Sequence, residues 1–381
     1  GVRTLLGKNA VNPESRMGVP DADVLSSWYS SAIDSGAEER VIGELKNGLT
    51  GAVAVLENGD GPVIGIRVDI DGLRLEESSN DSHEPSVEGF DSRYEGMMHA
   101  CGHDANAAIG IDILHQAAHS SFEGTLKVFF QPASEVEGGG AAMADTPNVS
   151  DIDHFILLKV GIGYDTGEVV AGANDIYGIQ RLRSEFSGEN AHAGFSPNEG
   201  HNAIHAMATA TQNLLGIPRH EDGDTRINVG TIAGGEAPNL IPKHGEIEID
   251  IRGKNQTLIS YMREKTDTIV EHSAKAHDCT VTTEVEGSAP GSNSDRSLGA
   301  QIDQTAQEMD SISKVHRNKS LGTGDDGAHL MEAVKNAGGT ATYTIVGADL
   351  ASGHHTTTFD LDEQSLDIAT ELIINYLTNL D

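Results

Sequence analysis

Hydrophobic and polar residues follow two different periods along the first part of the chain, and together they predict a mixed α/β domain. Apolar residues recur at helical spacing between about 15 and 47. Two β-type runs, 51–58 and 61–73, come next, and the Asn-Gly-Asp-Gly turn at 58–61 favours a hairpin between them. Residues 76–96 are polar, which is typical of a loop.

Helix and strand patterns alternate in the following stretch. A helix is expected from just after Cys101 to about 119, followed by a strand over 125–133 that leads into a glycine-rich turn. Apolar runs at 154–161 and 167–173 predict two more strands. Such alternation is typical of a three-layer α/β fold, in which helices cover both faces of one sheet.

The pattern changes near residue 175, where strands become alternating and antiparallel in character. Segment 175–289 is predicted to be an inserted α/β sandwich of about 110 residues, a reasonable size for a domain. The remaining segments, 1–174 and 290–381, then form the first domain. The sandwich has expected strands at 181–189, 227–234, 245–253 and 280–287 and helices at 200–215 and 256–276; the first domain resumes with helices at 297–309, 326–337 and 362–379 and a strand at 340–347.

The net charge of the chain narrows the classes of partner that it can bind. The chain has 25 Lys and Arg against 59 Asp and Glu, a net charge of −34, and the acidic residues are dispersed throughout. This excludes a nucleic-acid binder that works by neutralising phosphates, and it argues against docking on an anionic membrane. Concentrated salt screens the self-repulsion of such a surface, so we interpret the acid excess as adaptation to high salt.

The cysteine content and hydropathy bear on the compartment. With only Cys101 and Cys279, the chain has no disulfide framework, which favours a reducing compartment. No apolar run reaches the roughly 18–20 residues of a membrane span, and the first residues lack the pattern of a signal peptide. We expect a cytoplasmic protein.

The densest group of potential metal ligands is the sequence HACGHDAN at 99–106. A thiolate and imidazoles this close are apt ligands for zinc or a similar ion. Asp104 is expected to receive a ring N–H from a ligating imidazole. A buried cysteine beside histidines that cap a helix is the structural alternative.

Two other segments offer partners for this group. Glu135 and Glu137 follow the strand at 125–133, where α/β sheets place their sites, although a solvated acidic loop is the commoner case. His354 and His355 follow the strand at 340–347 on an irregular segment, where surface histidines are also common.

Six motifs in order resemble those of the two-metal aminoacylase/carboxypeptidase family, in its amidohydrolase branch. They are RVDIDGL, GMMHACGHD, FFQPASE, SGENAHAGFSPNEGHNA, GEAPNLIP and SGHHTTTFDLDE. The resemblance implies a metallopeptidase-like three-layer catalytic domain with an inserted smaller lid and dimerisation domain. It implies metal ligation by Cys101, His103, Glu135 and His355, polarisation of the scissile carbonyl by His192 across a homodimer, and substrate contact by Asn239.

Three positions depart from the family pattern. Ser134 stands where the family has its general base, and loss of a general base typically costs about 10²- to 10⁴-fold in rate. Lys159 stands where the family has a ligating His, and it is expected to place an ammonium where a second metal would sit. Asn106 replaces a common His, and Glu137 is a possible substitute base.

The resemblance therefore predicts a metal-dependent amidohydrolase that cleaves the amide of an N-acyl or N-aroyl amino acid. The cofactor is a divalent metal, zinc or manganese, with one or two ions per chain. The alternative is a catalytically impaired member that binds an amino-acid conjugate or serves as a partner subunit. Ser134 and Lys159 favour the alternative, whereas the intact HACGHD motif, His192 and His355 favour the enzyme.

Overall fold

The computed structural model describes residues 1–380, and the chain divides into two compact units. Unit 1 comprises residues 1–174, 293–321 and the segment from 325 onward; unit 2 comprises 175–292 and 322–324. Unit 2 thus extends three residues beyond the predicted boundary at 289 and includes a short later segment. Among the described residues, no helix is both long and apolar enough to cross a bilayer.

Unit 1 is built on one mixed eight-stranded sheet with the order β1-β2-β4-β3-β5-β16-β6-β14. Its strands are β1 (Val2–Leu6), β2 (Ala52–Asn58), β3 (Val63–Asp69), β4 (Gly124–Gln131), β5 (His154–Val160), β6 (Glu168–Val170), β14 (Lys314–His316) and β16 (Thr340–Val346), with β7 (Ala173–Asn174) and β15 (Lys319–Ser320) pairing separately. Its helices are α1 (Ala22–Asp34), α2 (Glu39–Glu44), α3 (Glu84–Glu88), α4 (His103–Ala117), α5 (Gly140–Ala144), α8 (Arg296–Gln307), α9 (Ala328–Asn336) and α10 (Gln364–Thr378).

The expected hairpin between β2 and β3 is wrong, because β4 lies between them. β4 pairs antiparallel with β2 and parallel with β3. The link between β2 and β3 passes the start of β4, where a Cβ on Gly61 would lie 2.4 Å from the carbonyl oxygen of Glu123. Glycine therefore allows a crossing here. The predicted loop at 76–96 also contains the short helix α3.

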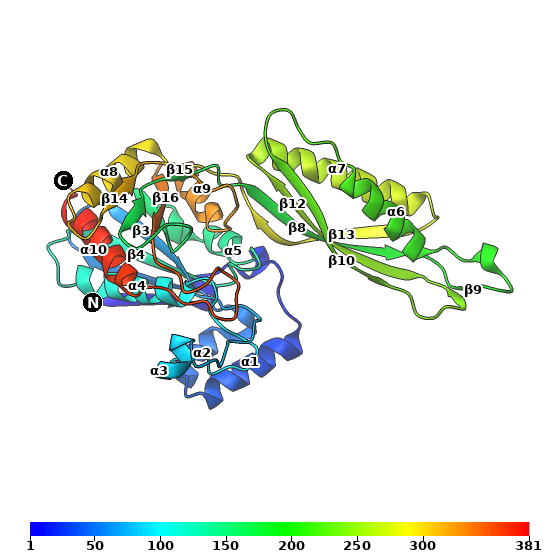
Figure 1. Cartoon of the computed structure of the whole chain (residues 1–381), viewed down its shortest axis with the longest axis horizontal. Helices are drawn as coiled ribbons and strands as arrows, with labels where there is room; N and C mark the ends of the chain where they lie inside the picture. Colours follow the sequence, from blue (N-terminus) through cyan, green and yellow to red (C-terminus); the bar gives the residue numbers. More distant parts are fainter. Residues whose placement is uncertain (381) are drawn as a thin grey trace. The chain divides into compact units, whose positions relative to one another are not determined.

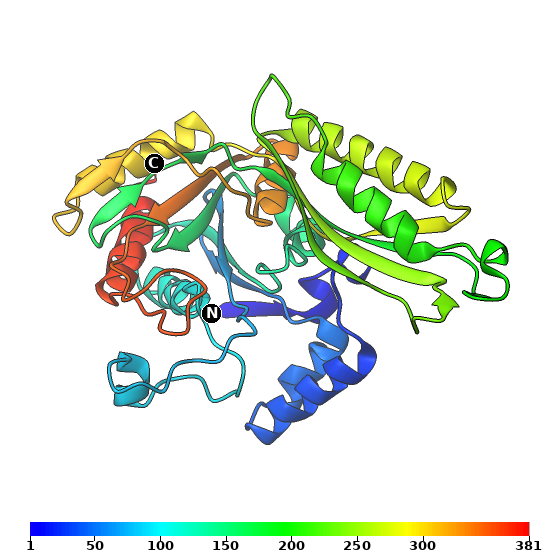
Figure 2. The same ribbon diagram turned by 45° about the vertical axis from the view of Figure 1, so that its right-hand side comes forward.

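The two faces of this sheet differ in polarity. Ile64, Ile66 and Val68 of β3 point to a hydrophobic core shared with α4, α8 and α10. Helices α4 and α10 contact each other on this side (Figures 1 and 2). Arg67 and Asp69 alternate with these residues and point to the other face, where α9 packs against β5 and β16. The expected α/β fold is confirmed, and the charged residues of β3 lie on the face opposite this core.

Unit 2 is an antiparallel four-stranded sheet with the order β10-β12-β8-β13, covered on one face by two helices (Figure 1). Apolar side chains from the sheet and both helices form its separate core. The elements are β8 (Gly178–Ser187), β9 (Ala191–His192), α6 (Ala203–Leu215), β10 (Thr225–Gly234), β11 (Leu240–Ile241), β12 (His244–Gly253), α7 (Gln256–Lys275) and β13 (Thr280–Ala289).

Candidate metal centre

Three side chains from distant parts of unit 1 meet at one point. Cys101 lies in the turn before α4, Glu135 follows the end of β4, and His355 lies in the loop after β16. One ligand atom of each lies within 4.8 Å of those of the other two. The thiolate, carboxylate and imidazole are a donor set that suits zinc or a similar transition ion.

Backbone contacts hold these loops together. The N–H of His355 donates to the carbonyl of Ala100 at 2.8 Å, which joins the C-terminal loop to the turn before α4. The N–H of Glu135 donates to Oδ2 of Asp71 at 2.9 Å, which joins the turn after β4 to the segment after β3. The close approach of the three ligand residues is therefore fixed by the chain itself.

The electrostatics of this group suit a bound cation. Burial opposes ionisation of Cys101, but contacts with His103 and His354 and the charge of Lys159 lower its pKa to about 4. Burial and the Cys101 thiolate raise the pKa of Glu135 to about 7. Oε1 of Glu135 is buried and accepts no hydrogen bond, and its charged neighbour is Nε2 of His103 at 3.4 Å. A buried carboxylate oxygen left without a partner is costly, and a metal ion at this point would satisfy it.

His103, the fourth ligand implied by the resemblance, is not in this group of three. Its Nδ1 lies 3.1 Å from Oδ1 of Asp71, and its Nε2 lies 2.7 Å from the ammonium of Lys159. Burial and the charge of Lys159 lower the pKa of His103, but the contacts with Asp69, Asp71 and Cys101 outweigh them and raise it to about 10. The prediction that Asp104 orients an imidazole is wrong for His103: Asp104 is exposed on the first turn of α4, and Asp71 contacts the ring instead.

A buried ion pair lies beside His103. The ammonium of Lys159 donates to Oδ2 of Asp69 at 2.5 Å, and the amide of Asn106 donates to Oδ1 of the same carboxylate at 2.7 Å. Asp69 and Asn106 are fully buried. Burial alone would raise the pKa of Asp69, but Lys159 and Arg67 hold it well below its usual range. Asn106 thus acts here as a donor to a carboxylate.

Ser134 is anchored by a buried network that the sequence patterns did not predict. Arg67 is fully buried and donates through Nη2 to Oγ of Ser134 at 2.8 Å and through Nη1 to Asp69 at 2.9 Å. Oγ of Ser134 lies 3.1 Å from Oδ1 of Asp326, and Oδ1 of Asp325 lies 3.3 Å from Arg67. A charged residue within the apolar run of β3 was the available signal for this network.

Glu137, the possible substitute base, lies in the same turn as Ser134. It is buried, with a left-handed backbone at φ 50°. Its N–H donates to the carbonyl of Ser134 at 3.1 Å. This side chain is outside the group of three converging donors.

The other two predicted site residues lie together in unit 2. His192 of β9 pairs with Leu240 of β11, and the carbonyl of Asn239 accepts a hydrogen bond from Ala193 at 3.0 Å. Nδ1 of His192 accepts the N–H groups of Gly194 and Phe195 at 3.1 and 3.2 Å. A neutral imidazole with Nδ1 as acceptor carries its proton on Nε2, so the exposed His192 presents an N–H donor.

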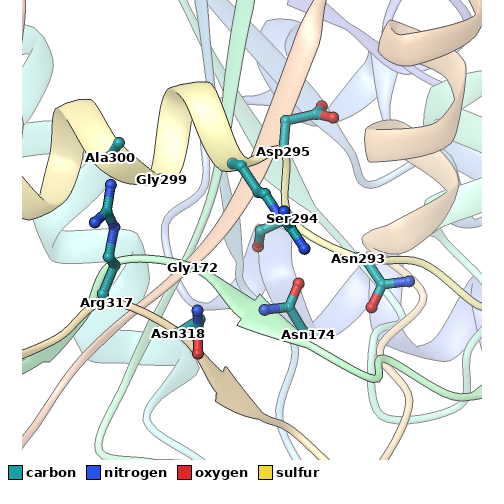
Figure 3. A pocket seen from close by; sticks show the side chains of 10 residues that line it. Gly172, Asn174, Asn293, Ser294, Asp295, Gly299, Ala300, Arg317 and Asn318 are labelled. Carbon is teal, nitrogen blue, oxygen red and sulfur yellow. The ribbon is translucent and has the colours of Figure 1, made fainter.

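A cavity of about 710 Å³ also lies in unit 1, and none of the three converging donors lines it. Ser294 and Asp295 before α8 line it together with Arg317 and Asn318 after β14 (Figure 3). None of the predicted site residues lines it. The converging donors, and not this cavity, therefore mark the candidate site.

Comparison with known proteins agrees with the motifs. The model of peptidase family M20/M25/M40 matches residues 65–379. One of the subunits of p-aminobenzoyl-glutamate hydrolase from Escherichia coli (strain K12) is 36% identical over 383 residues, covering 100% of this chain and 88% of that protein. Indole-3-acetyl-aspartic acid hydrolase of Enterobacter agglomerans is 33% identical over 377 residues, covering 98% of this chain and 86% of that protein.

A solved structure extends this agreement to the fold. The aminobenzoyl-glutamate utilization protein from Klebsiella pneumoniae superimposes with a TM-score of 0.84 at 27% identity, covering 100% of this chain and 87% of that chain. The family model begins in β3, which carries Arg67 and Asp69, and ends after α10. It spans every residue of the converging donor group, so the chain belongs to peptidase family M20/M25/M40.

Proposed function

We propose that this chain is a metal-dependent amidohydrolase that cleaves the amide bond of an N-acyl or N-aroyl amino acid. The observation that carries the proposal is the convergence of Cys101, Glu135 and His355 around a buried carboxylate oxygen without a hydrogen-bond partner. Two relatives are named for amides that join an aromatic acyl group to an acidic amino acid. We therefore expect an aminobenzoyl-glutamate-like conjugate as substrate.

Different residues of the chain would take the separate roles that amide hydrolysis requires. A divalent ion, zinc or manganese, held by Cys101, Glu135 and His355 would supply a Lewis acid for the carbonyl and the attacking water. His192 presents Nε2–H as a donor for the oxyanion that develops on the carbonyl. Asn239, beside it, offers a side-chain amide to the substrate. Ser134 contacts Arg67 and Asp326 and cannot accept a proton near neutral pH, so the carboxylate of the family's base position is missing; Glu137, in the same turn, is the alternative acceptor.

The test uses the two cysteines as a matched pair. The purified chain is assayed for hydrolysis of p-aminobenzoyl-glutamate and indole-3-acetyl-aspartate, before and after chelation and after return of zinc or manganese. Cys101→Ser should abolish metal-dependent hydrolysis, whereas Cys279→Ser, at a buried position in unit 2, should retain it. Hydrolysis that survives chelation and Cys101→Ser would contradict the proposal.

The alternative is a catalytically impaired member that binds a conjugate or serves as a partner subunit. The observation in its favour is that the Ser134 hydroxyl is held by Arg67 and Asp326 and is not a base at neutral pH. Calorimetric titration separates the two functions. Tight binding of a conjugate without turnover, in the presence of saturating metal, would support the alternative.

We also propose that unit 2 forms a homodimer. β10 is an edge strand of its sheet, and Ile232 on it is 54% exposed. Ile204 and Leu215 on α6, which contacts β10, are also exposed. Exposed apolar side chains beside a strand edge favour pairing with another chain. Light scattering should show a dimer that Ile232→Lys disrupts and Ile111→Lys, at an exposed position on α4 of unit 1, leaves intact; a monomeric parent chain would refute this.

We also propose that the protein works in a reducing compartment and is adapted to high salt, on the basis of its cysteines and its acidic charge. Both cysteines are free, which supports a reducing compartment such as the cytoplasm. On the sheet of unit 2, Arg183 is surrounded by Glu185, Glu246 and Glu286. Burial and the neighbouring glutamates raise the pKa of Glu286 despite Arg183. Such crowding of acids supports adaptation to high salt, where their repulsion is screened.

A further inference from the structure

Lys159, near the end of β5, lies between Asp69 and His103 beside the group of metal ligands. Its ammonium lies 2.5 Å from Oδ2 of Asp69 and 2.7 Å from Nε2 of His103. The side chain is only 6% exposed. Little solvent reaches these contacts, so the ammonium is held at one position between a carboxylate and an imidazole.

This arrangement decides what His103 can do. The ammonium lies within hydrogen-bond distance of Nε2, the ring nitrogen that a metal ion would have to approach. Nδ1, on the other side of the ring, faces Oδ1 of Asp71 at 3.1 Å. Lys159 therefore occupies the place at Nε2 of His103 that a metal ion would need.

Asp69 is engaged in the same way. One carboxylate oxygen receives Lys159 and Arg67, and the other receives the amide of Asn106. All contacts of this buried anion are made by fixed donors of the chain. The carboxylate and the imidazole that flank Lys159 are thus both satisfied without a metal ion.

We propose that the ammonium of Lys159 permanently takes the place of a second metal ion, so that each chain binds a single divalent ion at Cys101, Glu135 and His355. This inference rests on the proposed metal-dependent function and specifies the composition of its site. Lys159 is a positioning residue: it neutralises Asp69 and fixes His103 beside the occupied site. His103 belongs to the wall of the site and does not ligate the ion.

The experiment counts bound metal. The chain is dialysed to equilibrium against zinc or manganese, and the ions per chain are measured by plasma mass spectrometry. The parent should bind one ion per chain. Lys159→Ala should bind two, because Nε2 of His103 and the face of Asp69 Oδ2 that Lys159 contacts become available. Lys127→Ala is the matched control: Lys127 is also a buried lysine of the sheet, but its ammonium contacts Asp151 and should not affect the count.

Cobalt substitution adds a spectroscopic readout that does not depend on turnover. The thiolate-to-cobalt absorption of Cys101 should be present in the parent and in Lys159→Ala, and absent in Cys101→Ser. If Lys159→Ala does not fold, Lys159→His supplies a neutral imidazole at the same place and should also bind two ions. Two ions in the parent, or one ion in every folded Lys159 variant, would overturn the proposal. A parent that binds one ion but hydrolyses no amide would refute the proposed function and leave this inference standing.

Discussion

Arg67 is the side chain whose removal should most disturb unit 1. It is fully buried, and its guanidinium contacts Asp69 at 2.9 Å and lies 3.3 Å from Asp325 and 3.5 Å from Asp326. Nε also donates to Gln131 at 2.8 Å. We predict that Arg67→Met, which retains most of the side-chain volume, destabilises the fold, because it leaves three acidic groups without their shared cation.

The expected loss follows from the number of groups left unpaired. Removing one partner of a buried ion pair costs about 3–5 kcal/mol. Since each kcal/mol lowers the Tm of a domain of this size by about 2–4 °C, the Tm should fall by roughly 6–20 °C. The measurement is scanning calorimetry of the full chain at one fixed potassium chloride concentration.

The pH dependence distinguishes lost charge pairing from lost packing. In the parent, burial and Asp325 raise the pKa of Asp326 to about 7, although Arg67 opposes the shift. Without Arg67, the folded-state pKa of Asp326 rises further, because the cation that opposes the shift is gone. An acid whose pKa is raised by folding takes up a proton as the chain folds. It therefore lowers the stability of the folded chain at high pH, and this loss disappears as the pH falls. The fall in Tm caused by Arg67→Met should therefore be smaller at about pH 5 than at about pH 8.

The control for this experiment is Leu157→Ala. Leu157 is fully buried on the same face of the sheet, and its loss costs about 2–5 kcal/mol through a cavity, with no titrating group involved. Its deficit should be the same at both pH values. The electrostatic explanation is refuted if Arg67→Met has the same Tm as the parent. It is also refuted if the loss of Tm in Arg67→Met is as independent of pH as that in Leu157→Ala.

Three further predictions concern activity and salt. Ser134→Glu should raise amide hydrolysis at least about tenfold, because a carboxylate there can accept a proton; an unchanged kcat, with Glu137→Gln inactive, would identify Glu137 as the base. His192→Ala should lower kcat/KM by about 10²-fold through loss of an oxyanion donor, with unchanged circular dichroism; full activity in this variant would exclude that role. The Tm of the parent should rise between about 0.1 and 2 M potassium chloride as repulsion is screened, and a flat or falling Tm would remove the high-salt interpretation.

The local periodicity of the sequence was sufficient to predict the helices and strands discussed below, but not which strands pair in the sheet. The helix after Cys101 and the strand ending near Gln131 form as the patterns predict, because their apolar faces are continuous in sequence. The predicted β2–β3 hairpin is wrong because both strands pair with β4. This strand begins more than fifty residues after the end of β3. A short turn between two strands does not reveal that a third strand inserts between them.

The candidate site shows the same limit. Cys101, Glu135 and His355 were found because their motifs are local and the resemblance links them. Asp71 and Asp326 were missed because their roles arise from position in space: each accepts hydrogen bonds from turns distant in sequence. Asp104, adjacent to His103 in the chain, points elsewhere, since neighbours on a helix do not share a face.

The two main departures from the family pattern compensate each other in charge. At the position of Ser134 the resemblance expects Glu, so the substitution removes one negative charge from a partly buried site. At the position of Lys159 it expects a neutral ligating His, so replacing the second divalent ion by one ammonium removes one positive charge. The sum is unchanged, and a buried site tolerates an unbalanced charge poorly. Ser134 and Lys159 are therefore best understood as one coupled change, in which Arg67 and Lys159 together neutralise Asp69 and the chain itself supplies the charge that a second ion would otherwise bring.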